Sequence, residues 1–336
     1  MTDVVHTPVL PEETLELLSA APSLLREENR RNGLMVDATL GEGGHSEAFL
    51  SRFPDLKIIG IDADARILGV ATQRLQRFGG RITFYSGWAD DFFSLYFKNH
   101  EDHERPDIIL IDLGVSLFHY EKGDRGFSFR KDEVLDMRID TSRGEPVSSM
   151  LARLNERELA DILYYNADER YARRIARAIV ERRQMSALSS SAELADIVRR
   201  ALPAKESRGR VHPATKTFQA LRIMANRELE RLPELLESAF SVLNIGGRLG
   251  LISFHSLEDR IVKNFFREKA RVCVCPVSVP VCSCGGTPEL RLVTRKAVLP
   301  SQEELEKNPP SRSAKLRVAE KIREGRDNAF LPKVTA

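Results

Sequence analysis

The fold is decided by the stretch Leu34-Met35-Val36-Asp37-Ala38-Thr39-Leu40-Gly41-Glu42-Gly43-Gly44-His45. A short apolar run ends in a carboxylate, and a glycine-rich turn follows it at once. Helical spacing then starts near Ser46, so the turn opens a helix. Glycines let a ligand approach the backbone, and the N-terminus of a helix offers unpaired N–H donors. The stretch therefore predicts a ligand-binding strand, turn and helix.

The same alternation of strand and helix patterns continues along the chain. Helical spacing follows each of the first two strands, at Ser46–Phe53 and Ala65–Arg77. Strands rich in Ile and Val and separated by helices favour a parallel sheet that is covered on both faces. Two late segments alternate apolar and polar residues and predict an antiparallel pair that closes the sheet. The further strand-like runs are Leu56–Asp62, Arg81–Tyr85, Asp107–Asp112, Arg248–Phe254, and the closing pair Glu289–Lys296 and Ala314–Ala319.

The alternation breaks in the middle of the chain, where residues 113–211 contain no strongly strand-like run. Three segments have helical spacing instead: Glu156–Tyr165, Glu169–Arg183 and Ser191–Leu202. The segment Thr217–Leu243 predicts one helix or two, with Pro233 at the join or in a first turn. We therefore expect an inserted helical domain at 121–210, between two parts of a sheet domain at 1–120 and 211–336.

Three of the predicted strands end in a carboxylate, at Asp37, Asp62 and Asp112. Ligands of open α/β sheets bind outside the carboxyl ends of the strands, so these side chains should converge on one crevice. Asp62 follows the glycines by about 20 residues, where a carboxylate accepts hydrogen bonds from ribose hydroxyls. The plain alternative for each residue is a helix cap, and the three together could also suggest a divalent metal.

The glycine turn favours one nucleoside cofactor over another. A dinucleotide fingerprint needs a third glycine where this chain has Ser46. An acidic residue before the glycines, here Asp37, is common instead in enzymes that use S-adenosyl-L-methionine. The residues therefore predict a nucleoside cofactor, with an NAD-dependent dehydrogenase as the alternative.

Composition indicates a globular protein without a membrane span. The chain has 336 residues, of which 42% are hydrophobic and 30% charged. Its longest apolar runs, such as Ile108–Ile111 and Leu249–Phe254, are far shorter than the roughly 20 residues that span a bilayer. The N-terminal residues do not resemble a signal peptide, so we expect a cytoplasmic protein.

The net charge is only +2, from 51 basic and 49 acidic side chains. Binding to nucleic acid would therefore need basic residues that are grouped locally. Such a group occurs in and just after the predicted insertion, where it is either a phosphate-binding surface or a solvated helix face. Its members are Arg170, Arg173, Arg174, Arg177, Arg182, Arg183, Lys205, Arg208, Arg210 and Lys216.

Several long segments resemble the bacterial RsmH (MraW) family, methyltransferases that act on the N4 atom of a cytidine in 16S ribosomal RNA. The resemblance implies a class I Rossmann-like fold with an inserted helical domain, and S-adenosyl-L-methionine as the cofactor. It also implies a substrate in the decoding-centre, P-site region of the small ribosomal subunit. The segments are His6–Leu10, Asp37–Ser46, Leu113–Ser116, Arg125–Phe129, Leu135–Arg138, His212–Ala220, Ile252–Lys263 and Ser311–Ala319.

The resemblance also implies site residues, carried over position by position. Asp62 matches the family's ribose carboxylate, and Asp112 matches the acid at the end of the fourth strand. Where relatives have phenylalanine against adenine, this chain reads Gly87-Trp88-Ala89-Asp90-Asp91-Phe92, so either Trp88 or Phe92 could take that role. The further positions matched to the cofactor site are Gly43, Gly44, His45 and His119, the last where relatives often have glutamine.

Asp112 is the best catalytic candidate by its location. The N4 lone pair of cytosine is delocalised into the ring, and an acceptor for an amine hydrogen favours a more nucleophilic nitrogen. The target base must also leave its stack to reach the methyl group. Residues that could line its pocket or contact RNA, or could equally be structural, are Phe127, Phe129, His255 and Arg260.

The cysteines occupy one short segment, at Cys273, Cys275, Cys282 and Cys284. Thiolate coordination of zinc is one interpretation, although paired cysteines at a zinc site are usually further apart in sequence. Reduced free thiols are the other main interpretation and disulfides a lesser one, because the expected compartment is reducing. The sequence leaves this choice, and the oligomeric state, open.

Two further functions remain as alternatives. One is a ribosome-binding module that keeps the cofactor fold without turnover. The other is a DNA cytosine-N4 methyltransferase. Many DNA amino-methyltransferases carry Asp/Asn-Pro-Pro-aromatic where this chain reads Asp112-Leu113-Gly114-Val115. The missing prolines disfavour the DNA enzyme.

Overall fold

The computed structural model describes residues 7–25, 33–99, 104–122, 124–203, 206, 212–273, 275 and 286–324. These residues form two compact units. The sheet unit comprises the described residues of 7–62, 71–114 and 233–336, and the helical unit those of 63–70 and 115–232. The domain boundaries expected after residues 120 and 210 stay a prediction.

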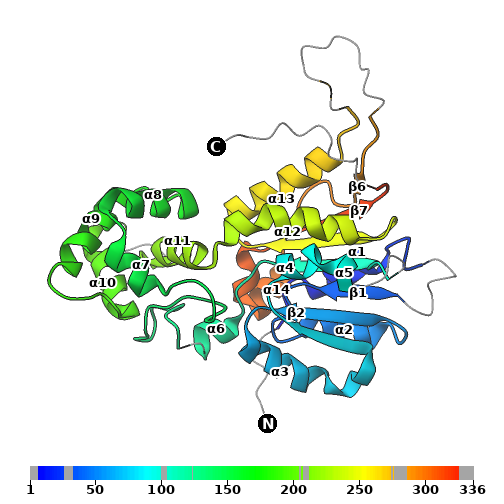
Figure 1. The fold of residues 1–336 in the computed structure, drawn as a ribbon, viewed down its shortest axis with the longest axis horizontal. Helices are drawn as coiled ribbons and strands as arrows, with labels where there is room; N and C mark the ends of the chain where they lie inside the picture. The colour runs from blue at the N-terminus through cyan, green and yellow to red at the C-terminus, as the bar shows by residue number, and fades with distance from the viewer. Residues whose placement is uncertain are drawn as a thin grey trace. The chain divides into compact units, whose positions relative to one another are not determined.

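The sheet unit (Figure 1) contains a seven-stranded sheet, in which the hydrogen-bonded order of the strands is β3-β2-β1-β4-β5-β7-β6. Strands β1 to β5 run parallel, whereas β7 is antiparallel to both β5 and β6. The predicted α/β class and the closing antiparallel pair are confirmed. The strands are β1 (Leu34–Asp37), β2 (Lys57–Asp62), β3 (Ile82–Ser86), β4 (Ile108–Asp112), β5 (Arg248–Ser253), β6 (Leu290–Leu292) and β7 (Lys315–Lys321).

The strand order argues against a dinucleotide-binding domain. The usual order of that fold is 3-2-1-4-5-6, whereas an antiparallel β7 here lies between β5 and β6. In β4, every residue from Ile108 to Ile111 is fully buried. Successive side chains of a strand point to opposite faces, so both faces of the sheet are covered at β4.

The helices that the apolar periodicity predicts are present, and they begin and end close to the predicted positions, whereas α1, α4 to α7 and α14 were not predicted. For example, the predicted helix Ser191–Leu202 corresponds to α10, whose N-cap Ser190 accepts a hydrogen bond from Glu193 N–H. The helices are α1 (Pro11–Ser19), α2 (Gly44–Arg52), α3 (Ala65–Leu75), α4 (Ala89–Ser94), α5 (Tyr96–Asn99), α6 (Leu117–Glu121), α7 (Val147–Arg153), α8 (Glu156–Ala167), α9 (Ala172–Arg183), α10 (Ser191–Ala201), α11 (Thr215–Asn226), α12 (Glu228–Val242), α13 (Ser256–Lys269) and α14 (Gln302–Lys307), with 3-10 turns at Gln76–Arg81 and Pro309–Ser313.

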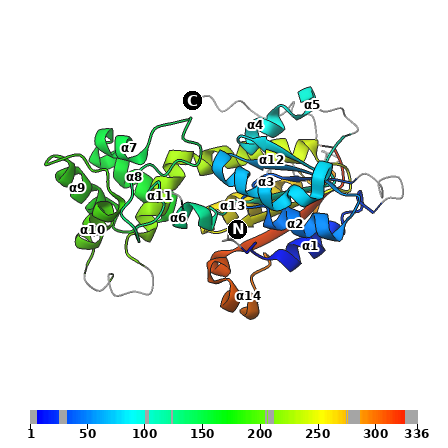
Figure 2. The same cartoon turned by 90° about the horizontal axis from the view of Figure 1, so that it is seen from below.

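The helical unit has its own hydrophobic core, to which α7 to α11 contribute (Figure 1 and Figure 2). Helix α8 starts with a capping box, in which Asn155 and Glu158 each bond the backbone N–H of the other. Amphipathic helices of this length gain most of their stability from burying one face. The fully buried members of this core include Leu159, Leu163, Ile175, Ile179 and Leu194.

The segment Thr217–Leu243 forms two helices, and the join differs from the predicted one. Helix α11 ends at Asn226, and Arg227 adopts a left-handed conformation with φ 52°. Pro233, which was expected at the join or in a first turn, lies inside α12. Glycine or asparagine usually takes the left-handed position after a helix, so an arginine there gives no sequence signal.

Among the described residues, no helix combines the length and the apolar character that a bilayer crossing needs.

Asn226 links α11 to the loop before α7 through two hydrogen bonds, of which the one to Met137 is buried and the one from Ile139 is partly buried. Its side chain accepts from Ile139 N–H at 2.7 Å and donates to Met137 O at 2.8 Å. Replacing Asn226 by Ala leaves Ile139 N–H and Met137 O without these hydrogen bonds. We therefore expect the free energy of unfolding of the helical unit to fall by about 2–3 kcal/mol. Urea denaturation followed by circular dichroism measures this loss. The exposed Gln184→Ala serves as the control, and equal losses in both variants would contradict the prediction.

Candidate functional site

The structure brings three strand-ending carboxylates to one edge of the sheet. Asp37 ends β1 and lies in register with Gly60 of β2 and Leu110 of β4. Asp62 and Asp112 therefore end the two neighbouring strands, each two residues further along. Because β1, β2 and β4 are parallel, all three carboxylates lie at the carboxyl edge, where α/β sheets bind ligands.

The glycine turn is held by Asp62. The N–H of Gly41 donates to Asp62 Oδ2 at 2.8 Å, so the carboxylate at the end of β2 fixes the turn after β1. Gly41 has φ 54°, and a Cβ there would meet no described atom within 4 Å. The turn therefore leaves open space over Gly41, next to a carboxylate. A backbone that a ligand can approach closely is what a nucleoside site requires.

Gly43 and Gly44 are needed for packing inside the unit. Gly43 is the N-cap of α2 with φ 81°, and a Cβ there would lie 2.7 Å from a methyl carbon of Leu75. At Gly44, a Cβ would lie 2.9 Å from Pro8 Cδ. His45 follows in the first turn of α2 and is buried. The predicted cofactor loop is thus one compact turn, while contacts of these residues with a cofactor remain a prediction.

Asp37 holds the start of α2 from the inside. It is buried, and Ser46 Oγ donates to its Oδ2 at 2.7 Å. Burial raises the pKa of Asp37 to about 6, although the hydrogen bond from Ser46 opposes the rise. The acid that precedes the glycines is therefore a structural anchor of the turn.

Asp112 ends β4 and is half-buried. Its Oδ1 accepts from Gly114 N–H at 2.9 Å, and its own N–H donates to Thr39 Oγ1 at 2.6 Å. Burial raises the pKa of Asp112 to about 7, and the carboxylates of Asp37 and Glu258 add to the rise. Near neutral pH this group changes between a proton donor and a proton acceptor, which general acid–base chemistry requires.

The two aromatic candidates after β3 differ in their surroundings. Phe92 is buried, and its ring contacts those of Tyr85, Phe93 and Tyr96 at centroid distances of 5.0, 5.5 and 5.7 Å. Trp88 is the N-cap residue of α4 and is half-buried. Phe92 is thus enclosed by other rings, and the contacts favour Trp88 for packing on adenine, a role that stays a prediction.

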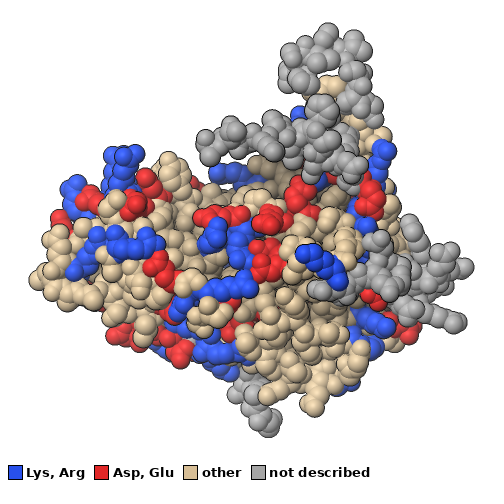
Figure 3. Space-filling model, in the orientation of Figure 1, with Lys and Arg blue, Asp and Glu red and all other residues tan. Residues whose placement is uncertain are grey.

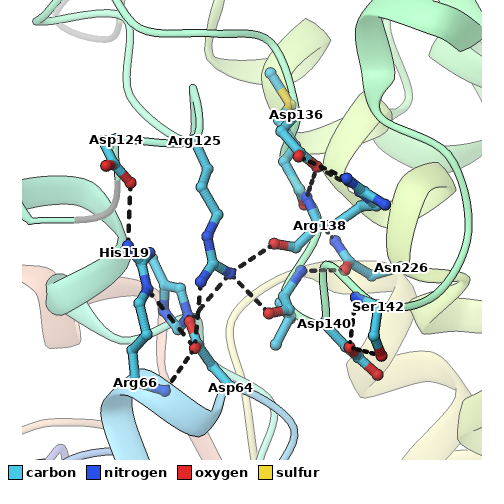
Figure 4. Close-up of polar contacts among 12 residues, drawn as sticks. Asp64, Arg66, His119, Asp124, Arg125, Asp136, Arg138, Asp140, Ser142 and Asn226 are labelled. Atoms are coloured by element: carbon cyan, nitrogen blue, oxygen red, sulfur yellow. Dashed lines mark hydrogen bonds and ion pairs between the residues drawn. The ribbon is translucent and has the colours of Figure 1, made fainter.

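His119 belongs to the helical unit, where it joins a buried ionic cluster (Figure 4). Its Nε2 lies 3.1 Å from Asp64 Oδ2, and Arg125 Nη1 lies 3.1 Å from the same oxygen. Burial opposes ionisation of Asp64. The hydrogen bonds from His119 and Arg66 N–H and the charge of Arg125 outweigh burial and lower the pKa of Asp64 to about 2. The sequence prediction missed Asp64, because Asp62 already explained the acidic end of β2.

The other pocket candidates make structural contacts. Phe127 is buried, and the ring of Phe129 stacks on His212 with centroids 4.2 Å apart. His255 is the N-cap of α13, where its Nδ1 accepts from Glu258 N–H and its Nε2 lies 2.9 Å from Glu258 Oε1. These contacts agree with the structural alternative for the three residues. Arg260 is exposed on α13, and an RNA contact there remains a prediction.

The cysteine question stays open. Cys273 and Cys275 are among the described residues, whereas Cys282 and Cys284 lie outside them. The same holds for three members of the basic group, Lys205, Arg208 and Arg210. Zinc or free thiols therefore remain alternatives at the cysteine segment.

The raised pKa of Asp112 predicts a pH-dependent gain in stability when the charge is removed. Below its ordinary pKa near 4, the carboxyl group is protonated in both the folded and the unfolded state, so its ionisation does not lower the free energy of unfolding. Above pH 7 its ionisation in the folded state costs at most about 4 kcal/mol, so the stability is lost as the pH rises from 4 to 7. We expect Asp112→Asn to raise the free energy of unfolding at pH 8 and to lose most of that gain at pH 4.5.

Urea denaturation at the two pH values measures this difference. The exposed Asp55→Asn is the control and should change stability little at either pH. An equal gain in the free energy of unfolding for Asp112→Asn at pH 4.5 and pH 8 would contradict the prediction, because it would mean that ionisation of Asp112 does not destabilise the folded state.

Comparisons with known proteins show the family of this chain. A sequence model of the MraW methylase family matches residues 3–322. The ribosomal RNA small subunit methyltransferase H of Treponema denticola is 53% identical, covering 95% of this chain and 98% of the relative. The protein of the same name from Syntrophobacter fumaroxidans is 45% identical, covering 94% and 96%.

A solved structure, the precorrin-6y C5,15-methyltransferase of Geobacter metallireducens, covers 95% of this chain and 94% of its own. Its identity is 11% and its TM-score 0.38, so the fold assignment rests on the strand order of this chain. The family match and the identities above extend over nearly the whole sequence. The chain belongs to the MraW methylase family.

Proposed function

We propose that this methylase transfers a methyl group from S-adenosyl-L-methionine to the exocyclic N4 of a cytidine in 16S rRNA. The target lies in the decoding-centre, P-site region of the small ribosomal subunit, and the enzyme works in the cytoplasm. The names of the relatives support the small-subunit rRNA as substrate. The observation that carries the chemistry is Asp112, a half-buried residue at the carboxyl edge, where desolvation raises the pKa of the carboxyl group to about 7.

The residues at the carboxyl edge fit the cofactor. Open space lies over Gly41, and Asp62 is a carboxylate that can accept hydrogen bonds from ribose hydroxyls. The half-buried Trp88 offers a flat ring for adenine. Gly43, Gly44 and His45 complete the turn, and His119 is a further cofactor residue by the resemblance. When bound, S-adenosyl-L-methionine supplies a methyl group that is already activated for transfer.

Asp112 handles the amine proton of the target base. Gly114 N–H occupies Asp112 Oδ1, which leaves Oδ2 to accept a hydrogen from the N4 amine. That hydrogen bond favours a more pyramidal nitrogen, whose lone pair is then available to the methyl carbon. The rest of the catalysis is in-line positioning. Asp112 therefore acts as a positioned acceptor, and as a base when the amine loses its proton.

The segment after Asp112 differs chemically from the Asp-Pro-Pro sequence of DNA amino-methyltransferases. Proline has no N–H, so a proline at position 114 could not donate the hydrogen bond that Gly114 gives to Asp112. A Cβ at Gly114 would also lie 2.5 Å from the ring of Phe254. These two observations favour the RNA enzyme over the DNA enzyme.

Part of the basic group on α9 is available for phosphate contacts. Arg182 pairs with Glu193, and Arg183 donates to the carbonyls of Leu151 and Leu154, so these two residues serve the fold. Arg173 and Arg177 are exposed, and Arg177 lies 3.5 Å from Glu156. On the face drawn in Figure 3, basic and acidic side chains are interspersed. We therefore assign RNA contact to Arg173 and Arg177 of α9.

Methylation of unmodified small subunits tests the proposed function. We expect incubation with labelled S-adenosyl-L-methionine to mark a single cytidine at N4, located by mass spectrometry of 16S rRNA fragments. In the same assay, Asp112→Asn should reduce the rate at least 100-fold, because the amide cannot take up the amine proton. A label on another base, or an unchanged rate for Asp112→Asn with unchanged cofactor affinity, would reject the respective assignment.

Charge reversal on α9 tests the RNA surface. We expect the double variant Arg173→Glu/Arg177→Glu to weaken binding to small subunits and to lower the slope of log affinity against log salt by about 2. Its affinity for S-adenosyl-L-methionine should not change. The matched control Arg199→Glu/Arg200→Glu makes the same charge change on α10. Equal weakening by both pairs would indicate a general charge effect and contradict a surface on α9.

A further inference from the structure

His119 carries a buried ring nitrogen that the described residues leave without a hydrogen bond. The residue is 4% exposed, and its Nδ1 is shielded from water. The other ring nitrogen, Nε2, lies 3.1 Å from Asp64 Oδ2. A buried polar atom without a partner costs about 1–3 kcal/mol, so such an atom in a native structure needs an explanation.

Asp64 determines which ring nitrogen carries the proton. Its pKa is lowered to about 2, so the group is an ionised carboxylate that can only accept hydrogen bonds. The nitrogen that faces it, Nε2 of His119, must therefore be the N–H donor. In the neutral ring the remaining nitrogen, Nδ1, then presents a bare lone pair.

The carboxylate is itself held on several sides (Figure 4). Arg66 N–H donates to Asp64 Oδ1 at 3.0 Å, and the guanidinium of Arg125 contacts both oxygens at 3.1 and 3.3 Å. Arg125 also donates to the backbone carbonyls of Arg138 and Ile139. These contacts fix the position of the carboxylate before any ligand arrives.

We propose that Asp64, oriented by Arg125, is a positioning residue that keeps His119 as a hydrogen-bond acceptor for an N–H group of the cofactor. This inference rests on the proposed function, in which His119 is a cofactor residue. S-adenosyl-L-methionine carries two N–H donors, the adenine amino group and the ammonium of its methionine part. A glutamine, which the resembled family often has at this position, would offer its carbonyl oxygen as the same kind of acceptor.

The variant Asp64→Asn tests the proposal because it reverses the tautomer. Oδ1 accepts hydrogen bonds from Arg66 N–H and from Arg125 Nη2, whereas Arg125 Nη1, which lies 3.1 Å from Oδ2, donates to the carbonyls of Arg138 and Ile139. The asparagine oxygen therefore takes the Oδ1 place. Its NH2 group then faces Nε2 of His119 and donates to it, which moves the ring proton to Nδ1. We expect calorimetry to show an affinity for S-adenosyl-L-methionine about 10- to 100-fold weaker. The control is Asp124→Asn, which alters an exposed partner of Arg66 and should leave the affinity unchanged.

¹⁵N NMR of histidine-labelled protein without cofactor determines which ring nitrogen of His119 carries the proton. His119→Gln identifies the signal by removing it. In the wild type we expect the ¹⁵N signals of His119 to show a protonated Nε2 and an unprotonated Nδ1. In Asp64→Asn we expect the reverse, an unprotonated Nε2 and a protonated Nδ1. Finding a bare Nε2 or a doubly protonated ring in the wild type would overturn the proposal.

The double variant separates positioning from a general loss of structure. With glutamine at position 119 there is no tautomer to reverse, so His119→Gln provides the reference affinity for the double variant. Adding Asp64→Asn to it should then weaken binding little further. An equally large effect of Asp64→Asn in both backgrounds would mean that Asp64 only supports the fold. Wild-type protein that binds no S-adenosyl-L-methionine would instead refute the proposed function.

Discussion

A carboxylate that is wholly or partly buried at the end of a parallel strand must find hydrogen-bond donors, and this constraint shapes the candidate site. Asp62 takes the N–H of Gly41, and Asp112 takes the N–H of Gly114. Asp37 takes the hydroxyl of Ser46. In each case the donor lies in a segment that follows a strand, so the acids set the course of these turns. The surface presented to a ligand thus follows from providing hydrogen-bond donors for these three acids.

The same residue type has opposite properties at two places in the chain. Asp64 lies among donors and a guanidinium, and its pKa falls to about 2. At Asp112 desolvation raises the pKa to about 7, one backbone donor opposes the rise, and two nearby acids add to it. The first is a permanent anion that can orient a neighbouring ring, whereas the second can exchange a proton near neutral pH. The different roles of the Asp64 and Asp112 carboxyl groups therefore follow from their surroundings alone.

The strands and the edge that carries the acids could be predicted because they follow from periodicity. Apolar runs that end in Asp predict both β-structure and the side of the sheet where ligands bind. The turn at Arg227 could not be predicted, because its left-handed backbone is imposed by the ends of α11 and α12. Phe92 and Trp88 look equivalent in sequence, and only the three rings around Phe92 separate them. The lowered pKa of Asp64 depends in part on the charge of Arg125, which is far away in sequence, and no local sequence pattern predicts such a pair.

The lack of a side chain at Gly114 has a consequence for how this sequence can vary. The ring of Phe254, just after β5, occupies the space that a Cβ at position 114 would need. The loop after β4 and the loop after β5 are therefore locked together sterically. A larger residue at position 114 becomes tolerable only when position 254 shrinks, so substitutions at these two positions should be inherited as pairs.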